Sequence, residues 1–282
     1  MPSYRYHLVN VFAETPFGGN PLAVFPDASG LDTATMQAIA CQMNLSETVF
    51  VFPDPTAAAA LRIFTPRHEL PFAGHPTLGS AAVLHRLHGL PDAFSLVTQA
   101  GTIPIVHQAE RFTLTAPQAS QRSANLSQAA AAEMLGLAEE DLLGPPVWLN
   151  AGSEQMLVRA ASRAAVLRAR PEPLFFRVRA QLYEGRSVAY LWHVAENVAT
   201  VRLFYDQHGA VLEDPGTGSA CANLGGWCAL NGLAPLSWRV EQGEAIGRPN
   251  VLYLDVSAEG VVTVGGKVWP VGEGVLFVPE PA

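Results

Sequence analysis

The 282-residue sequence has few cysteines, and they follow neither a metal-binding nor a disulfide pattern. Cys41, Cys221 and Cys228 form no CxxC pair, and three cysteines cannot all be paired within one chain. We therefore expect neither a disulfide framework nor a structural zinc site. Cys221 and Cys228 lie seven residues apart in a predicted helix, so they should share one packed face.

Basic runs and long apolar runs are also missing. The formal net charge is −8, with arginines scattered along the chain, which disfavours nucleic-acid binding. No apolar stretch approaches the ~18–20 residues that cross a bilayer, so we expect no membrane association. The N-terminus lacks the basic and apolar blocks of a secretory signal, and the expected location is cytoplasmic.

Apolar residues are abundant by comparison. They make up 49% of the chain and charged residues 15%, as in a soluble globular protein with a large core. The length suits two domains of about 140 residues each. Hydrophobic spacing predicts helices at 32–43, 77–87, 127–136, 160–169 and 219–230. It predicts strands at 4–12, 22–25, 48–52, 61–64, 94–98, 103–107, 112–115, 187–192, 200–205, 251–256, 261–264 and 275–278.

An internal repeat relates the two halves of the chain. The segment LRIF at 61–64 resembles VRLF at 201–204, and HGL at 88–90 resembles NGL at 231–233. Gln99 and Gln242 are separated by the same number of residues as HGL and NGL, so they match as well. Strand, loop, helix, turn and strand recur in the same order, which predicts a pseudo-twofold protein with a cleft between its halves.

Each half has a glycine-containing loop before its central helix. These loops are Ala73-Gly74-His75-Pro76-Thr77 and Gly216-Thr217-Gly218-Ser219. Free N–H groups at a helix start attract anions, and glycine lets the backbone approach a ligand closely. Two such loops across a cleft could bind a carboxylate. Neither loop is a dinucleotide or Walker motif.

Three ionisable residues accompany these loops. His75 lies in the first loop, and Asp214 directly precedes the second. Glu47 stands at the start of the apolar strand TVFVF, where partial desolvation would raise its pKa towards a value useful for proton transfer. A solvent-facing connector is the alternative reading for a glutamate at that position.

Metal binding and thiol chemistry have weaker support. His85 and His88 are i, i+3 neighbours on a helix, but the sequence places no acidic or cysteine partner beside them, and we expect no metal. Cys221 lies just inside a predicted helix, where a small packed residue is the favoured interpretation over a reactive thiol.

Four motifs together resemble one family. NVFAETPFGGNPLAVF (10–25), NLSETVF (44–50), FTPRHELPFAGHPTLG (64–79) and EDPGTGSA (213–220) are similar to signatures of the PhzF-like proteins, the phenazine biosynthesis type isomerases. They occur in the same order and extend over essentially the whole chain. The resemblance implies an α+β fold like that of diaminopimelate epimerase, with two pseudo-symmetric halves, each a barrel-like sheet around a central helix. We expect the first half to contain residues 1–118 and about 268–282, and the second about 119–267.

The resemblance also implies roles for individual residues. Glu47 corresponds to the family's acid/base, while His75, Asp214 and Ser219 correspond to residues around the substrate, with the backbone of Gly74 beside them. Thr77, Gly216, Thr217 and Gly218 complete the expected binding loops. The implied reaction moves a proton on a small carboxylate-bearing metabolite, for which dihydro-hydroxyanthranilate is the family's reference. It requires no cofactor, and the implied assembly is a homodimer.

Two alternatives remain at the level of sequence. Epimerases and racemases of this fold use two loop thiols, but the corresponding positions here align with Ala73 and Pro215, which disfavours that chemistry. The second alternative is a protein of the same fold that binds a small molecule without reacting with it.

Overall fold

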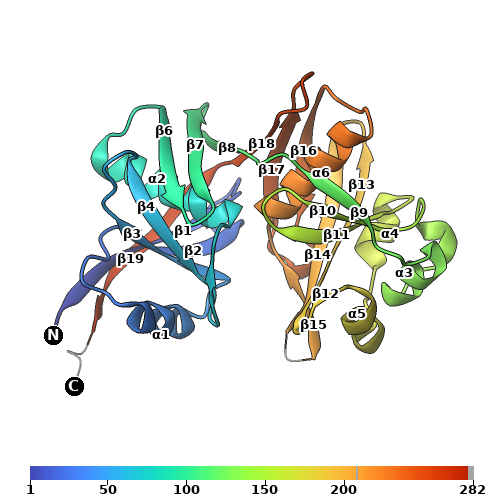
Figure 1. Ribbon diagram of the computed structural model, residues 1–282, viewed down its shortest axis with the longest axis horizontal. Coiled ribbons are helices and arrows are strands. Elements are labelled where there is room, and N and C mark those ends of the chain that lie inside the picture. The colour runs from blue at the N-terminus through green and yellow to red at the C-terminus, as the bar shows by residue number, and fades with distance from the viewer. Residues whose placement is uncertain (208, 279–282) are drawn as a thin grey trace. The chain divides into compact units, whose positions relative to one another are not determined.

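The computed structural model describes residues 1–207 and 209–278. The chain divides into two compact units (Figure 1). The first contains Met1–Thr115 and resumes at Gly265, and the second is Ala116–Val264. The sequence analysis drew these two boundaries at 118 and 267. Of the C-terminal segment assigned there to the first half, residues 279–282 lie outside the described residues.

The first unit is a sheet wrapped around one helix. Its strands are β1 (Ser3–Val11), β2 (Asn20–Phe25), β3 (Glu47–Phe52), β4 (Ala59–Phe64), β5 (Glu69–Leu70), β6 (Ala93–Thr98), β7 (Gly101–Gln108), β8 (Arg111–Thr115) and β19 (Val268–Phe277). Its helices are α1 (Thr33–Met43) and α2 (Gly74–His88). The strands pair in the order β19–β1–β2–β3–β4–β6–β7–β8. Helix α2 contacts strands at both ends of this order, β19 and β8, and also β1 to β3, so the sheet encloses it.

Helix α1 covers the outside of the same sheet. Asp32 caps its N-terminus by accepting a hydrogen bond from the Thr35 N–H. Its apolar face packs on a cluster that includes Phe25, Phe50 and Phe64. The rings of Phe25 and Phe50 stack with their centroids 5.0 Å apart. Strand β3 lies between α1 and α2 and is buried on both faces, which explains its uninterrupted apolar sequence.

The second unit is built in the same way. Its strands are β9 (Ser120–Ser123), β10 (Val147–Asn150), β11 (Glu154–Arg159), β12 (Gln181–Tyr183), β13 (Arg186–Ala195), β14 (Val198–Gln207), β15 (Ala210–Asp214), β16 (Leu236–Gln242) and β17 (Asn250–Val256). Its helices are α3 (Gln128–Met134), α4 (Arg163–Arg168), α5 (Pro173–Arg179) and α6 (Gly218–Leu230), with 3₁₀ turns at Glu139–Asp141 and Glu244–Ile246. Strand β18 (Val262–Gly266) carries the chain back towards the first unit.

The two units share one topology. In the first, β2–β3 is parallel, β3–β4 antiparallel, β4–β6 parallel and β6–β7 antiparallel. In the second, β11–β13, β13–β14, β14–β16 and β16–β17 repeat this series. Short strands β5 and β15 pair with β4 and β14, and each leads into the enclosed helix, α2 or α6. The predicted duplication and α+β class are therefore confirmed.

Most predicted elements lie within a few residues of the observed ones, with some exceptions. No helix was predicted over α5, although Glu172 caps it and Pro173 occupies its first position, which are both ordinary helix-start signals. The helix predicted at 160–169 is confined to Arg163–Arg168. The strand predicted at 275–278 begins earlier, at Val268. None of the described helices is long and apolar enough to cross a membrane.

Both central helices are buried on nearly every side, and small residues make this possible. A Cβ atom added at Gly79 of α2 would lie 2.4 Å from Leu22 Cδ2 and 2.9 Å from Val11 Cγ2. At Gly225 of α6 it would lie 2.6 Å from Val262 Cγ1. The strands therefore approach these helices at distances that only glycine allows at those positions.

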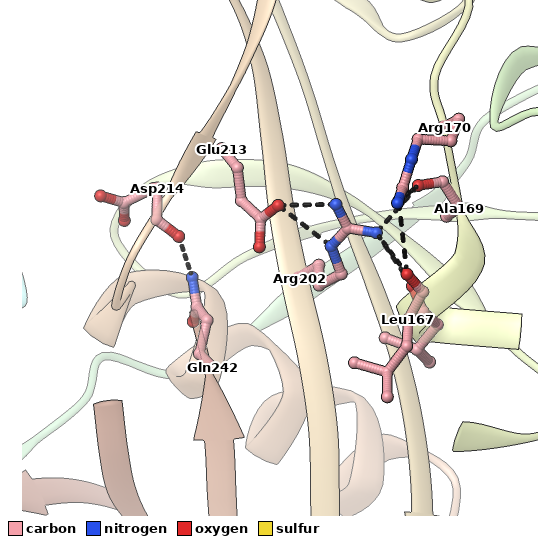
Figure 2. Close-up of polar contacts among 8 residues, drawn as sticks. Leu167, Ala169, Arg170, Arg202, Glu213, Asp214 and Gln242 are labelled. Atoms are coloured by element: carbon pink, nitrogen blue, oxygen red, sulfur yellow. Dashed lines mark hydrogen bonds and ion pairs between the residues drawn. The ribbon is translucent and has the colours of Figure 1, made fainter. Parts of the chain in front are cut away.

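An arginine–glutamate pair recurs at the same place in both units. Arg62 on β4 donates to Glu69 on β5, and Arg202 on β14 donates to Glu213 on β15. The second pair is the more buried, with side chains 7% and 5% exposed against 29% and 18% for the first. Arg202 also donates to the carbonyls of residues 166, 167 and 169 around the C-terminal end of α4 (Figure 2). This buried arginine links three elements of the second unit.

Replacing Arg202 by Met should destabilise the protein by about 3–5 kcal/mol, because the Glu213 carboxylate would remain buried without its partner. The matched change Arg62→Met should cost less, about 1 kcal/mol, because water can reach the Glu69 carboxylate. Urea denaturation followed by circular dichroism measures both. The double change Arg202→Met with Glu213→Leu should recover the part of the loss that comes from the unpaired carboxylate, but not the part from the three carbonyls that lose their donor. Equal losses for the two single variants would contradict this account.

Candidate active site

Glu47 lies at the first position of β3, beside the N-terminus of the enclosed helix α2. Its register partner on the parallel strand β2 is Leu22. The side chain is 17% exposed, and its Oε2 lies 3.5 Å from Nδ1 of His75, on the first turn of α2. The predicted acid/base and the predicted loop histidine are therefore neighbours in the first unit.

His75 is almost completely buried, with its side chain 6% exposed. Burial lowers the pKa of His75 to about 3, against a smaller raising effect of a hydrogen bond to the Pro21 backbone carbonyl. The imidazole is therefore neutral at neutral pH. A neutral ring beside Glu47 can orient a polar group but does not stabilise the carboxylate as a cation would.

Among its described residues, the second unit has no counterpart of this pair at the equivalent positions. The pairing of β13 with β14 places Ala189 opposite Phe204, as β3 with β4 places Thr48 opposite Phe64. Ala189 is therefore equivalent to Thr48, and the residues that precede them, Val188 and Glu47, occupy equivalent positions. At the helix start, Ser219 occupies the position of His75. The duplicated scaffold thus carries a carboxylate at only one of these two equivalent strand positions.

Adjacent carboxylates at the end of β15 have different surroundings. Glu213 faces Arg202, whereas Asp214, the next residue, lies on the opposite face of the strand (Figure 2). The Asp214 carboxylate accepts a hydrogen bond from Thr217 Oγ1, at the start of α6. Of the two acidic residues in the EDPGTGSA motif, Glu213 forms a buried ion pair and Asp214 lies at the helix N-terminus.

Gln242, buried at the end of β16, holds the loop between β15 and α6. Its Nε2 donates to the Asp214 backbone carbonyl at 2.8 Å and to Thr217 Oγ1 at 3.0 Å. Its Oε1 accepts from the Thr217 N–H at 3.1 Å. Gln99, its match in the sequence repeat, is exposed. The loop after Asp214 is therefore fixed by a glutamine side chain, whereas the Ala100 N–H donates to the Pro71 carbonyl before α2.

Ser219 is positioned by a second buried amide network. Gln155 Nε2 donates to Ser219 Oγ at 3.0 Å, and Gln155 Oε1 accepts from Asn223 Nδ2. Asn223 also accepts from the Ala151 N–H at 2.6 Å and donates to the Ser153 carbonyl at 2.8 Å. Gln155 and Asn223 are 3% and 0% exposed. This network orients the Ser219 hydroxyl relative to β10 and β11.

The remaining predicted binding residues form the two helix starts. Gly74 and Gly218 are the first residues of α2 and α6, and no described side chain caps either helix. Thr77 Oγ1 donates to the Ala73 carbonyl at 2.8 Å, so its proton is used within the first turn. Gly216 packs against Asn250, whose Oδ1 would lie 2.2 Å from an added Cβ. Uncapped N–H groups at each helix start can interact with an anion.

The structure corrects one alignment made from the sequence. Ala73 is the N-cap residue of α2, and the N-cap residue of α6 is Thr217, whereas the sequence analysis aligned Ala73 with Pro215. Three residues separate the strand from the helix in both units, 71–73 between β5 and α2 and 215–217 between β15 and α6, so Ala73 matches Thr217 by position. The correction leaves no thiol at either helix start. Cys221 is buried within α6, and burial raises the pKa of its thiol well above the usual range.

The sequence analysis did not identify Gln155, Asn223 or Tyr190. Gln155 is distant in sequence from Ser219, so only the fold brings it there, whereas Asn223 lies one turn after Ser219 on α6 and holds Gln155. Tyr190, on β13, is fully buried, and its hydroxyl makes no hydrogen bond within the part of the chain that the structure describes. Burial raises the pKa of Tyr190, and Cys221 and Asp214 raise it further. Tyr190 therefore lies close enough to Asp214 to interact with it electrostatically.

The candidate residues thus form two groups, each within its own unit. Glu47 and His75 lie together in the first unit, with Gly74 and Thr77 on the same helix turn. Asp214, Thr217 and Ser219 gather around the start of α6 in the second, with Gly216 and Gly218 between them.

Comparison with known proteins identifies relatives over the whole length of the chain. Residues 9–274 match a protein-family model described as phenazine biosynthesis-like protein, PhzC-PhzF. The chain is 50% identical to an uncharacterised isomerase of Pasteurella multocida, with 98% of this chain and 95% of that protein covered. It is 34% identical to trans-2,3-dihydro-3-hydroxyanthranilate isomerase of Pseudomonas fluorescens, with 97% of each covered.

A solved structure agrees with these sequence matches. The structure of a predicted epimerase from Pseudomonas aeruginosa superposes with a TM-score of 0.83 at 33% identity. The alignment covers 98% of this chain and all of that one. The similarity therefore extends over both units and includes every motif on which the candidate site depends.

The low pKa of His75 predicts a pH-dependent stability. Between pH 6.5 and about 3 the unfolded chain binds a proton at this histidine and the folded chain does not. The free energy of unfolding should therefore fall as the pH is lowered from 6.5, by up to about 1.4 kcal/mol per pH unit from this residue. Urea denaturation at several pH values should show that His75→Gln removes this part of the slope between pH 6.5 and 5.

The matched control is His88→Gln, an exposed histidine at the other end of the same helix. It should keep the wild-type slope. If His75→Gln and wild type lose stability in parallel over this range, the folded protein binds the proton at His75 and the burial argument is wrong.

Proposed function

Because this chain belongs to the PhzC-PhzF family of phenazine biosynthesis-like proteins and is an isomerase, we propose that it moves a proton on a small carboxylate-bearing metabolite, with Glu47 as acid and base. The observation that carries this proposal is the position of Glu47. Glu47 is the first residue of β3, whose inner residues are buried. Its side chain is mostly shielded from water and faces a neutral histidine. Desolvation makes a carboxylate a stronger base than it is in water.

The proposed step needs only one proton-transfer group. The Glu47 carboxylate takes a proton from a carbon of the substrate, and the electron pair of that C–H bond moves into the adjacent double-bond system. The protonated Glu47 then delivers the proton to a second carbon of the same system, where a new C–H bond forms. The product is an isomer of the substrate, and the carboxylate is regenerated.

His75 supports this step as a neutral partner. A protonated imidazole 3.5 Å from Glu47 would stabilise the carboxylate and make it a weaker base. Burial prevents this, since it lowers the pKa of His75 to about 3. The ring can instead hydrogen-bond a polar substituent of the substrate and hold the reacting carbon close to Glu47.

The second group of residues would bind polar groups of a substrate. Gln242 holds the Asp214 backbone carbonyl, Thr217 donates to the Asp214 carboxylate, and Gln155 holds the Ser219 hydroxyl. These oxygen atoms are therefore positioned before a ligand arrives. The uncapped starts of α2 and α6 suit a carboxylate. That one substrate contacts both groups stays a prediction.

The substrate class follows from chemistry and from one relative. The Pseudomonas fluorescens relative is named for trans-2,3-dihydro-3-hydroxyanthranilate, a cyclic carboxylate with an amino and a hydroxyl substituent. Asp214 suits an amino or hydroxyl donor, and a helix start suits the carboxylate. We therefore propose a cyclic carboxylate of this kind. A cytoplasmic homodimer, and a role in phenazine biosynthesis, remain predictions.

The direct test is Glu47→Gln. With trans-2,3-dihydro-3-hydroxyanthranilate as the probe substrate, this variant should lower kcat by about 10²–10⁴, because an amide cannot accept the proton. Isomerisation is followed by absorbance, and incorporation of deuterium from D₂O reports the proton transfer separately. Glu140→Gln, a change at an exposed glutamate, is the control and should retain wild-type kcat.

Other outcomes favour other functions. If Glu47→Gln retains near wild-type turnover, Glu47 is not the acid/base. Deuterium exchange at a single chiral carbon, with inversion and with sensitivity to thiol alkylation, would indicate an epimerase or racemase. Tight binding of the probe without any exchange would indicate a binding protein. The buried Cys221 and the absence of a thiol at Ala73 and Thr217 disfavour the second outcome.

A further inference from the structure

A separate group of metal-ligand side chains lies in the first unit. His85, Asp92 and His107 each offer a ligand atom, and these three atoms lie within 4.8 Å of one another. His85 is on the last turn of α2, ten residues after His75, so the two histidines are about 15 Å apart along the helix axis. The group therefore shares no residue with the candidate active site and lies well away from Glu47.

The distances from the Asp92 carboxylate to the two imidazoles suit ligands of one small cation. Asp92 Oδ1 lies 3.2 Å from His107 Nδ1 and 3.6 Å from His85 Nε2. A tetrahedral zinc ion with ligands at 2.0–2.1 Å separates its ligand atoms by about 3.3–3.4 Å. A distance of 3.6 Å is too long for a hydrogen bond between His85 and Asp92, but it is close to the spacing of two ligands on one ion.

The backbone already holds the three residues in place. The His107 N–H donates to the Asp92 carbonyl at 2.7 Å, where β6 and β7 pair. The C-cap residue of α2 is Gly89, whose N–H donates to the His85 carbonyl at 2.9 Å, and only residues 90 and 91 separate it from Asp92. Little ordering is therefore required for these side chains to bind an ion together.

An aromatic side chain orients both imidazoles. The Phe112 ring stacks on His107 with centroids 4.4 Å apart and meets His85 edge to face at 5.6 Å. The two histidine rings are 4.6 Å apart. Their side chains are 24% and 26% exposed, and Asp92 is 77% exposed, so an ion can reach the group from solvent.

We propose that His85, Asp92 and His107 bind a divalent transition-metal ion, with Zn²⁺ the best fit, which fastens the end of α2 to the β6–β7 hairpin. Two imidazoles and one carboxylate are ligands that zinc prefers, whereas Mg²⁺ and Ca²⁺ require mainly oxygen ligands. Three protein ligands leave one tetrahedral position for solvent.

This proposal revises the expectation from the sequence. The sequence analysis considered His85 with His88 and found no acidic residue beside them. His88 is exposed and does not belong to the group. The acidic ligand is Asp92, beyond the end of the helix, and the second histidine is His107, on β7. Neither proximity follows from helical spacing, because a turn and a strand pairing bring these residues to His85.

Isothermal titration calorimetry of untagged protein with ZnCl₂ tests the proposal. We expect one ion per chain at micromolar zinc, and no heat of binding with MgCl₂. His85→Ala, Asp92→Ala and His107→Ala should each weaken zinc binding at least about tenfold. His88→Ala, on the same helix turn but outside the group, should bind zinc as wild type does. Asp92 is exposed, so Asp92→Ala should fold even if a histidine variant does not.

Two further measurements separate a built site from zinc held elsewhere on the surface. Co²⁺ in the wild-type protein should give the intense visible absorption of tetrahedral coordination, and Asp92→Ala should lose it. Zinc should raise the thermal unfolding temperature of wild type and of His88→Ala but not of Asp92→Ala. The proposal is overturned if wild type binds no stoichiometric zinc, or if Asp92→Ala and His88→Ala bind it equally well.

Discussion

The burial of one helix inside each sheet is the constraint on which the rest of the structure depends. A helix surrounded by strands must be apolar or small on every side, as α2 and α6 are, and must admit strands as close as those beside Gly79 and Gly225. Backbone N–H groups without intrahelical partners then remain at the helix starts, and a polar side chain within the helix, such as Asn223, must be hydrogen-bonded by neighbouring strands. The architecture therefore places the chemistry at the first turn of each helix, and the end of α2 is the place where His85 meets Asp92 and His107.

A duplicated scaffold reaches asymmetric chemistry through a few substitutions at equivalent positions. Glu47 faces the start of α2, whereas the second unit has Val188 at that strand position. His75 and Ser219 follow the first residue of the two helices. The shared Arg62–Glu69 and Arg202–Glu213 pairs, by contrast, maintain the hairpin that leads into each helix. What the halves have in common stabilises the fold, and what distinguishes them includes the groups proposed for proton transfer and binding.

Electrostatics assigns different tasks to residues of similar type. Glu213 and Asp214 are adjacent, but strand geometry turns one towards Arg202 and the other towards the start of α6 (Figure 2). His75 is buried and neutral beside Glu47, while His85 and His107 stand near solvent beside a carboxylate. Burial and partners, more than residue type, distinguish these groups from one another.

The sequence by itself determined the duplication, most of the strands and helices, and the motifs that carry Glu47, His75, Asp214 and Ser219, because these depend on local periodicity and short spacings. Only the tertiary structure decided which residues meet. It brought together residues that are remote in sequence: Glu47 with His75, Gln155 with Ser219, and Asp92 with two histidines. The alternation of a strand turned Glu213 and Asp214 to opposite faces. The observed helix starts matched Ala73 with Thr217. No local pattern encodes the contacts between remote residues, since they arise when strands pair around an enclosed helix.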